Sequence, residues 1–538
     1  MRRPTRTALP VAVLAAAVAC LSVPPGVAVA EPVVADLPLG PAGTTQSATV
    51  EQLAPGLTHT TIVRGAPDPA TPWVVELSIP AGETSPDPDA PARAVQDRAA
   101  ADALVERLAA AGVDAQAEAV QQPAVADLPA AVIGYRVRLT TPFADQGAAD
   151  AAVDGLRTSG FSARSWYRGW DGGSEDPGRW TVNVLTIDPD DFTGELGLGT
   201  GPDLERRETV SQLAAEADAL AAVNGGFFVL DPAAGAPGDP AGATVVDGTV
   251  LSEPVGRRPV LVLPSDADGA AVVRPTWRGE VIVQRRDRGT RPPTSALDGL
   301  NRVPGLIRNC GGLDDVPFEG PRHDATCTDD AELVAFTTDF GASTPTGPGA
   351  EVVLDAAGRV RAVHADRGVV LADGQRSVQA TGDRVAELAG VRVGDRLRVT
   401  TDLSTGRRTL TRDGVSVVNG GPELLRRGEP HITQRADGMW RADDPSFAYG
   451  WVLQRNPRTF AGVDAEGRTL LVTVDGRQPD ELGLSIPETA AVAQALGMES
   501  ALNLDGGGST AMVVGGDLVS SPSDAAGERP VGDVVWVR

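Results

Sequence analysis

The sequence predicts a mixed α/β protein with a small α+β module inserted near its N-terminal end. Three patterns lead to this fold class. Residues 469–504 show an apolar strand, a helix from about 485 to 496 and a second strand. Residues 92–167 show the order helix, strand, strand, helix, strand. Residues 331–417 contain several short strands separated by Gly and Asp turns. We therefore expect a catalytic domain built on a mixed sheet, interrupted by a small module.

Composition excludes several functional classes. The chain has 538 residues, 42% of them hydrophobic and 22% charged, which is typical of globular domains. Its net charge of -25 argues against binding to nucleic acid or to an anionic membrane surface. All 47 basic side chains are arginines, so Schiff-base chemistry, a P-loop lysine and a lysine general base are excluded. The four histidines are scattered, and we predict no His-rich metal site.

The N-terminus predicts export. Arg2, Arg3 and Arg6 precede an apolar stretch at about 8–23, and an A-x-A pattern follows at 28–30. This is typical of a secretory signal peptide over residues 1–30. Cys20 also allows a lipoprotein reading, although the residues before it match that signal poorly. No other stretch is long and apolar enough to span a bilayer. We expect a secreted, extracellular protein with a possible cell-wall association.

Two cysteines remain after the signal, Cys310 and Cys327. A catalytic thiol would need a histidine partner, and only His323 lies nearby in sequence. In an oxidising compartment, a disulfide closing this Gly- and Asp-rich loop is favoured, with a stabilisation of roughly 3 kcal/mol.

We predict five regions. After the signal come a flexible leader at 31–52 and the first strands of the catalytic domain at 53–79. The module with its Pro- and Asp-rich linkers occupies 80–178, and the catalytic domain continues over 179–538. The strand at 179–188 repeats the pattern of the strand at 73–79, which favours an insertion.

The module resembles a SPOR domain in its order of elements. The resemblance covers 80–90 residues and includes no chemical motif, so a generic α+β insertion fits the pattern equally well. What the resemblance implies is binding to peptidoglycan glycan strands.

Two carboxylates are expected at one edge of the catalytic sheet. Asp475 follows the strand at 469–474, and Asp505 follows the strand at 501–504. Strands joined by a helical crossover run in the same direction, so both carboxylates come to the edge where ligands bind in α/β sheets. Arg458 and Arg477 lie close in sequence to this edge and could bind phosphate. A structural Asp–Arg network is the alternative. Ser485 and Glu488 have capping-box spacing, which assigns Glu488 a structural role.

Gly506, Gly507 and Gly508 follow Asp505 and precede Ser509 and Thr510. Backbone N–H groups of such a stretch can line an anion site, and the two hydroxyls add donors. A tight strand–turn–strand is the alternative. Asn224 also ends a small-residue strand before two glycines, where it could orient a substrate or satisfy the turn backbone. Gly420 and Gly421 form a third glycine-bearing strand end.

Five motifs together resemble the phosphodiester glycosidase family. They are NGGFF at 224–228, GGP at 420–422, NPRT at 456–459, DGR at 475–477 and NLDGGGS at 503–509, and ERPV at 528–531 resembles the closing motif of the family. The resemblance implies a mixed α/β domain that cleaves a sugar C1–O bond whose oxygen carries a phosphodiester. It implies catalytic roles for Asp505, Asp475 and Asn224. The substrate- or phosphate-binding residues would be Arg458, Arg477, Asn503, Gly506, Gly507, Gly508, Ser509, Thr510, Gly420 and Gly421. The Pro-rich loop at 231–242 and the inserted module differ from the family pattern. The resemblance therefore does not identify the substrate.

Two other functions remain compatible with the sequence. Asp475 and Asp505 could bind Mg²⁺ or Ca²⁺ in a metal-assisted phosphodiesterase that cleaves P–O, although no cofactor is required by the leading hypothesis. A non-catalytic protein that binds peptidoglycan through the module is the third reading.

Overall fold

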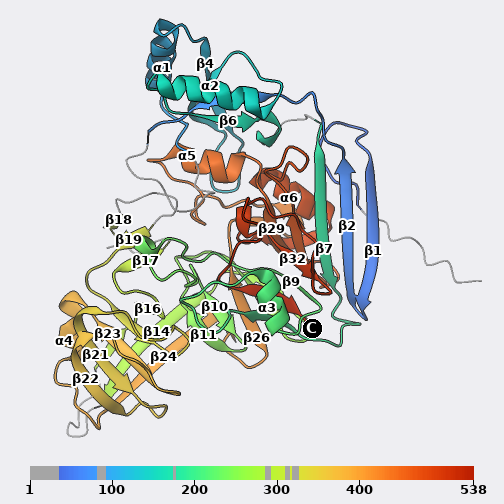
Figure 1. Cartoon of the computed structure of the whole chain (residues 1–538). Helices are drawn as coiled ribbons and strands as arrows, with labels where there is room; N and C mark the ends of the chain where they lie inside the picture. Colours follow the sequence, from blue (N-terminus) through green and yellow to red (C-terminus); the bar gives the residue numbers. More distant parts are fainter. Residues whose placement is uncertain (1–34, 81–91, 174–176, 285–292, 309–315, 318–325) are drawn as a thin grey trace, which may run out of the picture. The chain divides into compact units, whose positions relative to one another are not determined.

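The computed structural model describes residues 35–80, 92–173, 177–284, 293–308, 316–317 and 326–538 (Figure 1). The predicted signal peptide at 1–30 and Cys310 lie outside these residues. Within the described ranges, every helix is too short or too polar to cross a bilayer.

An eight-stranded sheet forms the centre of the larger domain, the one that the sequence predicts to be catalytic. Its strands lie in the order β1-β2-β7-β30-β29-β31-β27-β28. Their bounds are β1 Gln46–Ala54, β2 Leu57–Gly65, β7 Arg179–Ile187, β30 Thr469–Val474, β29 Arg458–Asp464, β31 Met498–Asn503, β27 Glu423–Arg426 and β28 Glu429–Pro430. β2 and β7 flank the module in sequence and pair along their whole length, from Leu57↔Ile187 to Gly65↔Arg179. The chain therefore leaves this sheet after β2 and returns to the adjacent position.

The predicted flexible leader is wrong over its second half. β1 begins at Gln46 and pairs with β2, and Leu37 and Leu39 are fully buried. The guanidinium of Arg64 donates to the carbonyl of Leu39 at 2.6 Å, and the Gln46 amide donates to the carbonyl of Ala35. The apolar composition of this segment reflects burial against the sheet.

A second sheet of five strands packs on the first. Its order is β33-β32-β9-β34-β8, with bounds β33 Asp517–Leu518, β32 Met512–Val514, β9 Ala221–Asn224, β34 Val534–Val537 and β8 Leu196–Gly199. Leu185, Leu471 and Leu502 of the first sheet share one buried cluster with Val223 and Val535 of the second. Helix α3 (Val210–Glu216) packs beside β9, and a capping box between Thr209 and Gln212 starts it.

The remaining strands form a β-rich region with its own core. One sheet has the order β11-β10-β26-β12-β13, with β11 Thr249–Ser252, β10 Thr244–Val246, β26 Val415–Asn419, β12 Val260–Pro264 and β13 Ala271–Val273. A second comprises β15 Thr294–Ala296, β14 Thr276–Gln284, β24 Arg396–Thr405 and β25 Arg408–Thr409. A third comprises β16 Gly299–Leu300, β20 Leu333–Phe336, β23 Arg376–Ala380, β21 Gly347–Leu354 and β22 Val360–Arg367, beside helix α4 (Val385–Leu388). A small sheet comprises β17 Leu306–Arg308, β19 Thr326–Thr328 and β18 Val316–Pro317. Valines and leucines of the first three sheets form one buried cluster.

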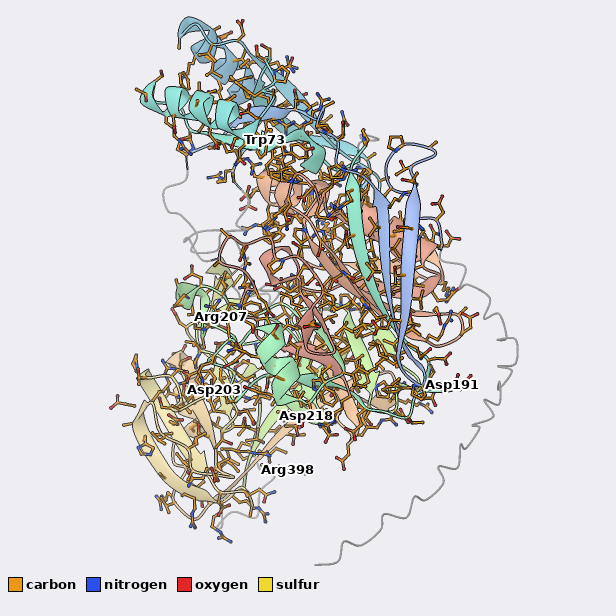
Figure 2. The ribbon with its side chains drawn as sticks, turned by 45° about the vertical axis from the view of Figure 1, so that its right-hand side comes forward. Trp73, Asp191, Asp203, Arg207, Asp218 and Arg398 are labelled. Atoms are coloured by element: carbon orange, nitrogen blue, oxygen red, sulfur yellow. The ribbon has the colours of Figure 1, made fainter. Side chains whose placement is uncertain are left out.

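The module has the predicted order of elements. It comprises α1 Arg98–Ala110, β4 Ala115–Gln122, β5 Ala131–Leu139, α2 Gln146–Thr158 and β6 Ala163–Tyr167. Asp97 and Asp145 cap the two helices, each accepting a hydrogen bond from a backbone N–H three residues on. The domain boundary needs correction, because β3 (Trp73–Leu77) pairs with β5 and β6 and not with the catalytic sheet. Trp73, labelled in Figure 2, packs against Tyr167 of β6.

The predicted strand–helix–strand unit is present as β30, α6 (Ile486–Ala495) and β31. Both strands run antiparallel to β29, so they share one direction, but β29 lies between them. The Ser485–Glu488 capping box is also present. Because β29 lies between β30 and β31 and runs antiparallel to both, it begins at the edge of the sheet where those two strands end.

Candidate active site

The active-site edge is formed where β30 and β31 end and β29 begins. The N–H of Gly507, after β31, donates to the carbonyl of Pro457 at 2.9 Å. Gly476, after β30, lies so close to Pro457 that a Cβ at this position would be 2.8 Å from the proline nitrogen. The loops carrying Asp505 and Asp475 therefore flank the segment that enters β29.

Asn224 holds the backbone of this edge together. Its side chain is fully buried, with Oδ1 accepting from the Thr459 hydroxyl at 2.6 Å and from the N–H of Ala511 at 3.2 Å. Its Nδ2 donates to the carbonyl of Asp505 at 2.8 Å. The polar atoms of Asn224 thus join β9, β29 and the loop after β31. The catalytic role of Asn224 stays a prediction.

Asp505 is partly exposed and lies among hydrogen-bond donors and cations. Its carboxylate accepts from the Ser509 hydroxyl and the N–H of Gly506, and the charges of Arg529 and Arg308 act on it. Burial raises the pKa of Asp505 to about 6, despite these stabilising contacts.

Asp533, which the sequence reading missed, is the carboxylate that interacts with Asp505. It precedes β34 and is 3% exposed, with Oδ1 accepting from the N–H of Gly226 at 2.7 Å. Its Oδ2 has no hydrogen-bond partner among the described residues. Burial, together with the negative charge of Asp505, raises the pKa of Asp533 to about 7. The pairing of β9 with β34 brings it to the site, and no local motif marks it.

Asp475 belongs to a different cluster at the same edge. Its Oδ1 accepts from the N–H of Ser521 at 2.9 Å, and its charged neighbours are Glu481 and Arg179. Burial raises the pKa of Asp475 to about 7, and Glu481 adds to the rise. The charges that act on Asp475 are thus those of Glu481 and Arg179, whereas the charge of Asp505 acts on Asp533. The catalytic pairing of Asp475 with Asp505 stays a prediction.

The two predicted phosphate-binding arginines differ in accessibility. Arg458 is 2% exposed, and its guanidinium donates to the carbonyls of Leu484 at 2.8 Å and Trp451 at 2.6 Å. Arg458 therefore stabilises the backbone beneath the sheet edge, and its guanidinium is not exposed at that edge. Arg477 is partly exposed, adopts φ +57°, and donates through Nε and Nη2 to Oδ1 of Asn456 at 2.9 and 2.7 Å.

The glycine loop is a tight turn whose backbone donors are largely committed. The N–H groups of Gly506 and Gly507 donate to Asp505 and Pro457, and those of Ser509 and Thr510 donate to preceding carbonyls. The predicted anion cradle of free N–H groups is therefore not formed by these residues. Gly508 instead leaves room for the guanidinium of Arg529, which a Cβ there would contact.

Two buried polar atoms near this loop have no hydrogen-bond partner within the described ranges, Oδ1 of Asn503 and Oγ1 of Thr510. Gly420 and Gly421 support the end of β31, because the Gly421 N–H donates to the carbonyl of Asn503 at 2.7 Å and its carbonyl accepts from the Asn503 amide at 3.2 Å. This turn therefore orients Asn503 beside Asp505.

Arg308 connects the carboxylate pair with a further buried acid. It ends β17, and its charge acts on both Asp505 and Asp239. Burial and the charge of Glu253 raise the pKa of Asp239 well above its usual range. Arg308, Asp239 and Glu253 line a small pocket, together with Arg302, Ser252 and Ile307. No group of three or more His, Cys, Asp and Glu side chains suited to a metal ion occurs in the described part of the chain.

Cys327 lies buried in β19, and its predicted partner Cys310 is outside the described residues. The disulfide stays a prediction.

Comparison with known proteins gives two family matches. Residues 348–538 match the phosphodiester glycosidase family and residues 92–167 match the SPOR domain. The mouse N-acetylglucosamine-1-phosphodiester alpha-N-acetylglucosaminidase is 35% identical over 112 residues, which cover 20% of this chain and 21% of the mouse protein. The bovine protein of the same name is 35% identical over the same length. The chain thus spans about one fifth of the length of the curated relatives it matches.

Among solved structures, a putative exported protein from Burkholderia pseudomallei matches with a TM-score of 0.80 and 36% identity, covering 93% of this chain and 98% of that one. A hypothetical protein from Synechocystis shares the fold at a TM-score of 0.52 and 17% identity, covering 91% of this chain and 76% of that one. Residues 348–538 of this chain are therefore similar to the phosphodiester glycosidase family, and the region similar to a SPOR domain lies ahead of them in sequence.

Proposed function

We propose that this protein hydrolyses the glycosidic C1–O bond of a sugar-1-phosphodiester. The observation that carries the proposal is the pair formed by Asp505, which is partly exposed, and the buried Asp533, whose pKa is raised by the charge of Asp505. With pKa values of about 6 and 7, Asp505 is mostly ionised and Asp533 about half protonated near neutral pH, so an ionised and a protonated carboxyl group are available together.

In the proposed reaction, water attacks C1 and the bond from C1 to the phosphate-bearing oxygen breaks. The products are a free sugar and a phosphate monoester. Asp505 is assigned the ionised role, stabilising positive charge at C1 as nucleophile or base, because arginines lie near it. Asp533 holds the proton on its unpartnered side and delivers it to the leaving oxygen, or receives one from water.

The phosphate is assigned to arginines around the pair. Arg308 and Arg529 already act electrostatically on Asp505, and Arg477 lies partly exposed at the neighbouring strand end. Planar guanidinium groups bind phosphate oxygens in pairs. The amide oxygen of Asn503 and the hydroxyl of Thr510 are buried without a hydrogen-bond partner among the described residues, and each could form a hydrogen bond with a sugar hydroxyl. Asp475 remains a second acidic candidate at this edge.

The expected substrate is a cell-envelope glycoconjugate. The predicted signal peptide favours export, and the inserted SPOR domain favours binding to peptidoglycan. Together these support a site of action outside the cytoplasm, at the cell wall.

A product assay in H₂¹⁸O tests the reaction. We expect the sugar and a phosphate monoester from a glycosyl phosphodiester such as UDP-N-acetylglucosamine, with ¹⁸O in the sugar. The Asp505→Asn variant should lose about 10³-fold in kcat, because the charge at C1 is no longer stabilised. Asp517→Asn, at the exposed start of β33, is the matched control and should match the wild type.

Two results would overturn the proposal. Appearance of ¹⁸O in the phosphate would indicate P–O cleavage, the metal-assisted alternative, which loss of activity with a chelator would support. Absence of turnover on glycosyl phosphodiesters, with retention on purified peptidoglycan, would favour a binding protein.

A further inference from the structure

The inserted SPOR domain is joined to the segment that leads into the active-site edge. Helix α5 (Pro445–Ala448) continues directly as the π-helix η4 (Tyr449–Leu453), which ends five residues before β29. The buried hydroxyl of Tyr449 donates to Oε2 of Glu76 at 2.7 Å and accepts from Nη1 of Arg136 at 2.8 Å. Glu76 and Arg136 belong to β3 and β5, so one hydroxyl connects η4 to two strands of the SPOR sheet.

The chain leaving the SPOR domain is fastened to the same segment. The N–H of Arg455 donates to the carbonyl of Trp170 at 2.8 Å, and its Nη1 donates to the carbonyl of Gly169 at 2.9 Å. Asp171 forms a β-bridge with Gln454. These contacts attach the two residues that follow η4 to the chain segment that leaves the SPOR domain.

The carbonyls of η4 fix the residues that enter the site. The carbonyl of Gly450 accepts from Nδ2 of Asn456 at 3.0 Å, and the carbonyl of Trp451 accepts from Arg458 at 2.6 Å. With its amide held in this way, Asn456 presents Oδ1 to Arg477. A π-helix is rare and is often found at functional sites, because its wider turn redirects backbone carbonyls.

We propose that the SPOR domain helps to form the substrate site. Its residues Glu76 and Arg136 bind the Tyr449 hydroxyl and so fix η4. η4 in turn fixes Asn456, which positions Arg477 to bind the phosphate. Tyr449 is a positioning residue that acts through Asn456 and does not touch substrate. The inference rests on the proposed function, since Arg477 is assigned to the phosphate there. A SPOR domain that only tethers the enzyme to the wall would make the Tyr449 contacts a matter of packing alone.

The Tyr449→Phe variant of the full chain tests this link, since it removes one hydroxyl and keeps the ring. We expect KM for UDP-N-acetylglucosamine to rise about 10-fold with kcat changed by less than about 2-fold, because phosphate is held in both the ground and transition states. The matched control is Tyr135→Phe. Tyr135 precedes Arg136 on β5 and therefore points to the opposite face of the sheet, where its ring contacts Arg98. This control should leave KM unchanged.

A double-mutant cycle separates positioning from packing. Arg477→Gln alone should raise KM, and Tyr449→Phe should add less than about 2-fold on that background, because both changes remove one interaction. Multiplicative effects of the two changes would overturn the proposal.

Should Tyr449→Phe not accumulate as folded protein, Arg136→Gln carries the same test from the other side of the contact. It removes a donor to the Tyr449 hydroxyl and should also lose its effect on KM in the Arg477→Gln background. If the wild type hydrolyses the substrate and KM is unchanged in both Tyr449→Phe and Arg136→Gln, the positioning role is refuted and the proposed function still stands. A wild type inactive on glycosyl phosphodiesters would instead refute the proposed function and this inference with it.

Discussion

Two buried acidic clusters in this protein have opposite protonation behaviour. At the contact between the SPOR domain and η4, Glu76 is fully buried and ion-paired with Arg164 at 2.6 Å and Arg138 at 3.0 Å. Burial alone would raise the pKa of Glu76, but Arg164 and Arg138 hold it at about 2. At the active-site edge, burial raises the pKa values of Asp505 and Asp533 to about 6 and 7.

The difference lies in how each acid is compensated. Glu76 accepts directly from guanidinium groups and the Tyr449 hydroxyl, so its charge is neutralised in place. Asp533 accepts from one backbone N–H and faces another carboxylate, so its proton is retained at neutral pH. Glu76 and Asp533 are therefore both buried, but direct arginine partners keep Glu76 ionised, whereas Asp533, without such a partner, has a raised pKa.

The largest expected effect is on turnover at the second cluster. Asp533→Asn should reduce kcat by about 10²–10⁴-fold, since an amide cannot transfer a proton. Measured at pH 4, where the Asp533 carboxyl of the wild type is protonated, the unfolding midpoint should stay near the wild-type value, because the variant keeps an acceptor for the Gly226 N–H. Steady-state kinetics with thermal unfolding of the same preparation measures both. Near-wild-type kcat would remove Asp533 from the mechanism.

At the first cluster the expected effect is on stability. Glu76→Gln removes a fully buried carboxylate from the buried Arg138, which keeps Asp171, and from the partly exposed Arg164, and should reduce the free energy of unfolding by about 3–5 kcal/mol. Urea denaturation followed by tryptophan fluorescence reports this change. Arg98→Gln, which breaks an exposed pair with Asp102 and a contact with the Tyr135 ring, is the control and should cost less than about 1 kcal/mol. Equal midpoints for the two variants would mean that the buried cluster contributes nothing specific.

The two clusters should also give opposite slopes of stability against pH. The pKa of Asp533 is raised in the folded state, so the folded protein binds more protons and stability falls as pH increases from about 4 to 7. The full contribution is up to about 4 kcal/mol. The pKa of Glu76 is lowered, so its contribution is present above the unfolded pKa and lost as pH falls toward 2.

Thermal unfolding of the wild type and Asp533→Asn between pH 4 and 8 measures this slope. The variant should lose much of the decrease between pH 4 and 7. Parallel curves for the two proteins would show that Asp533 ionises normally in the folded state.

The smallest effect is expected at the neighbouring acid of the same edge. Asp475→Asn should lower kcat by less than about 10-fold, because Asp475 faces Ser521, Glu481 and Arg179 and not the Asp505 pair. Steady-state kinetics of Asp475→Asn and Asp533→Asn under the same conditions measures this difference. A loss equal to that of Asp533→Asn would return Asp475 to the catalytic pair, as the sequence predicts.

Local patterns were sufficient for much of the fold and for one half of the site. Apolar runs and capping residues predicted β30, α6 and β31, because each depends on neighbours within a few residues. Asp505 stood out because it directly follows such a strand and precedes three glycines. The order of elements in the SPOR domain was predicted for the same reason.

Residues brought in from distant strands could not be predicted. Asp533 reaches Asp505 only through the pairing of β9 with β34, Asn224 becomes a brace only when β9 packs beside β29, and Arg458 turns inward because three carbonyls converge on it. The sequence by itself determined the family resemblance, the strand ends and one carboxylate, since these are local or are carried by motifs. Only the tertiary structure decided which acid is its partner and which arginines are free to face a phosphate, because burial and charge depend on which chain segments meet.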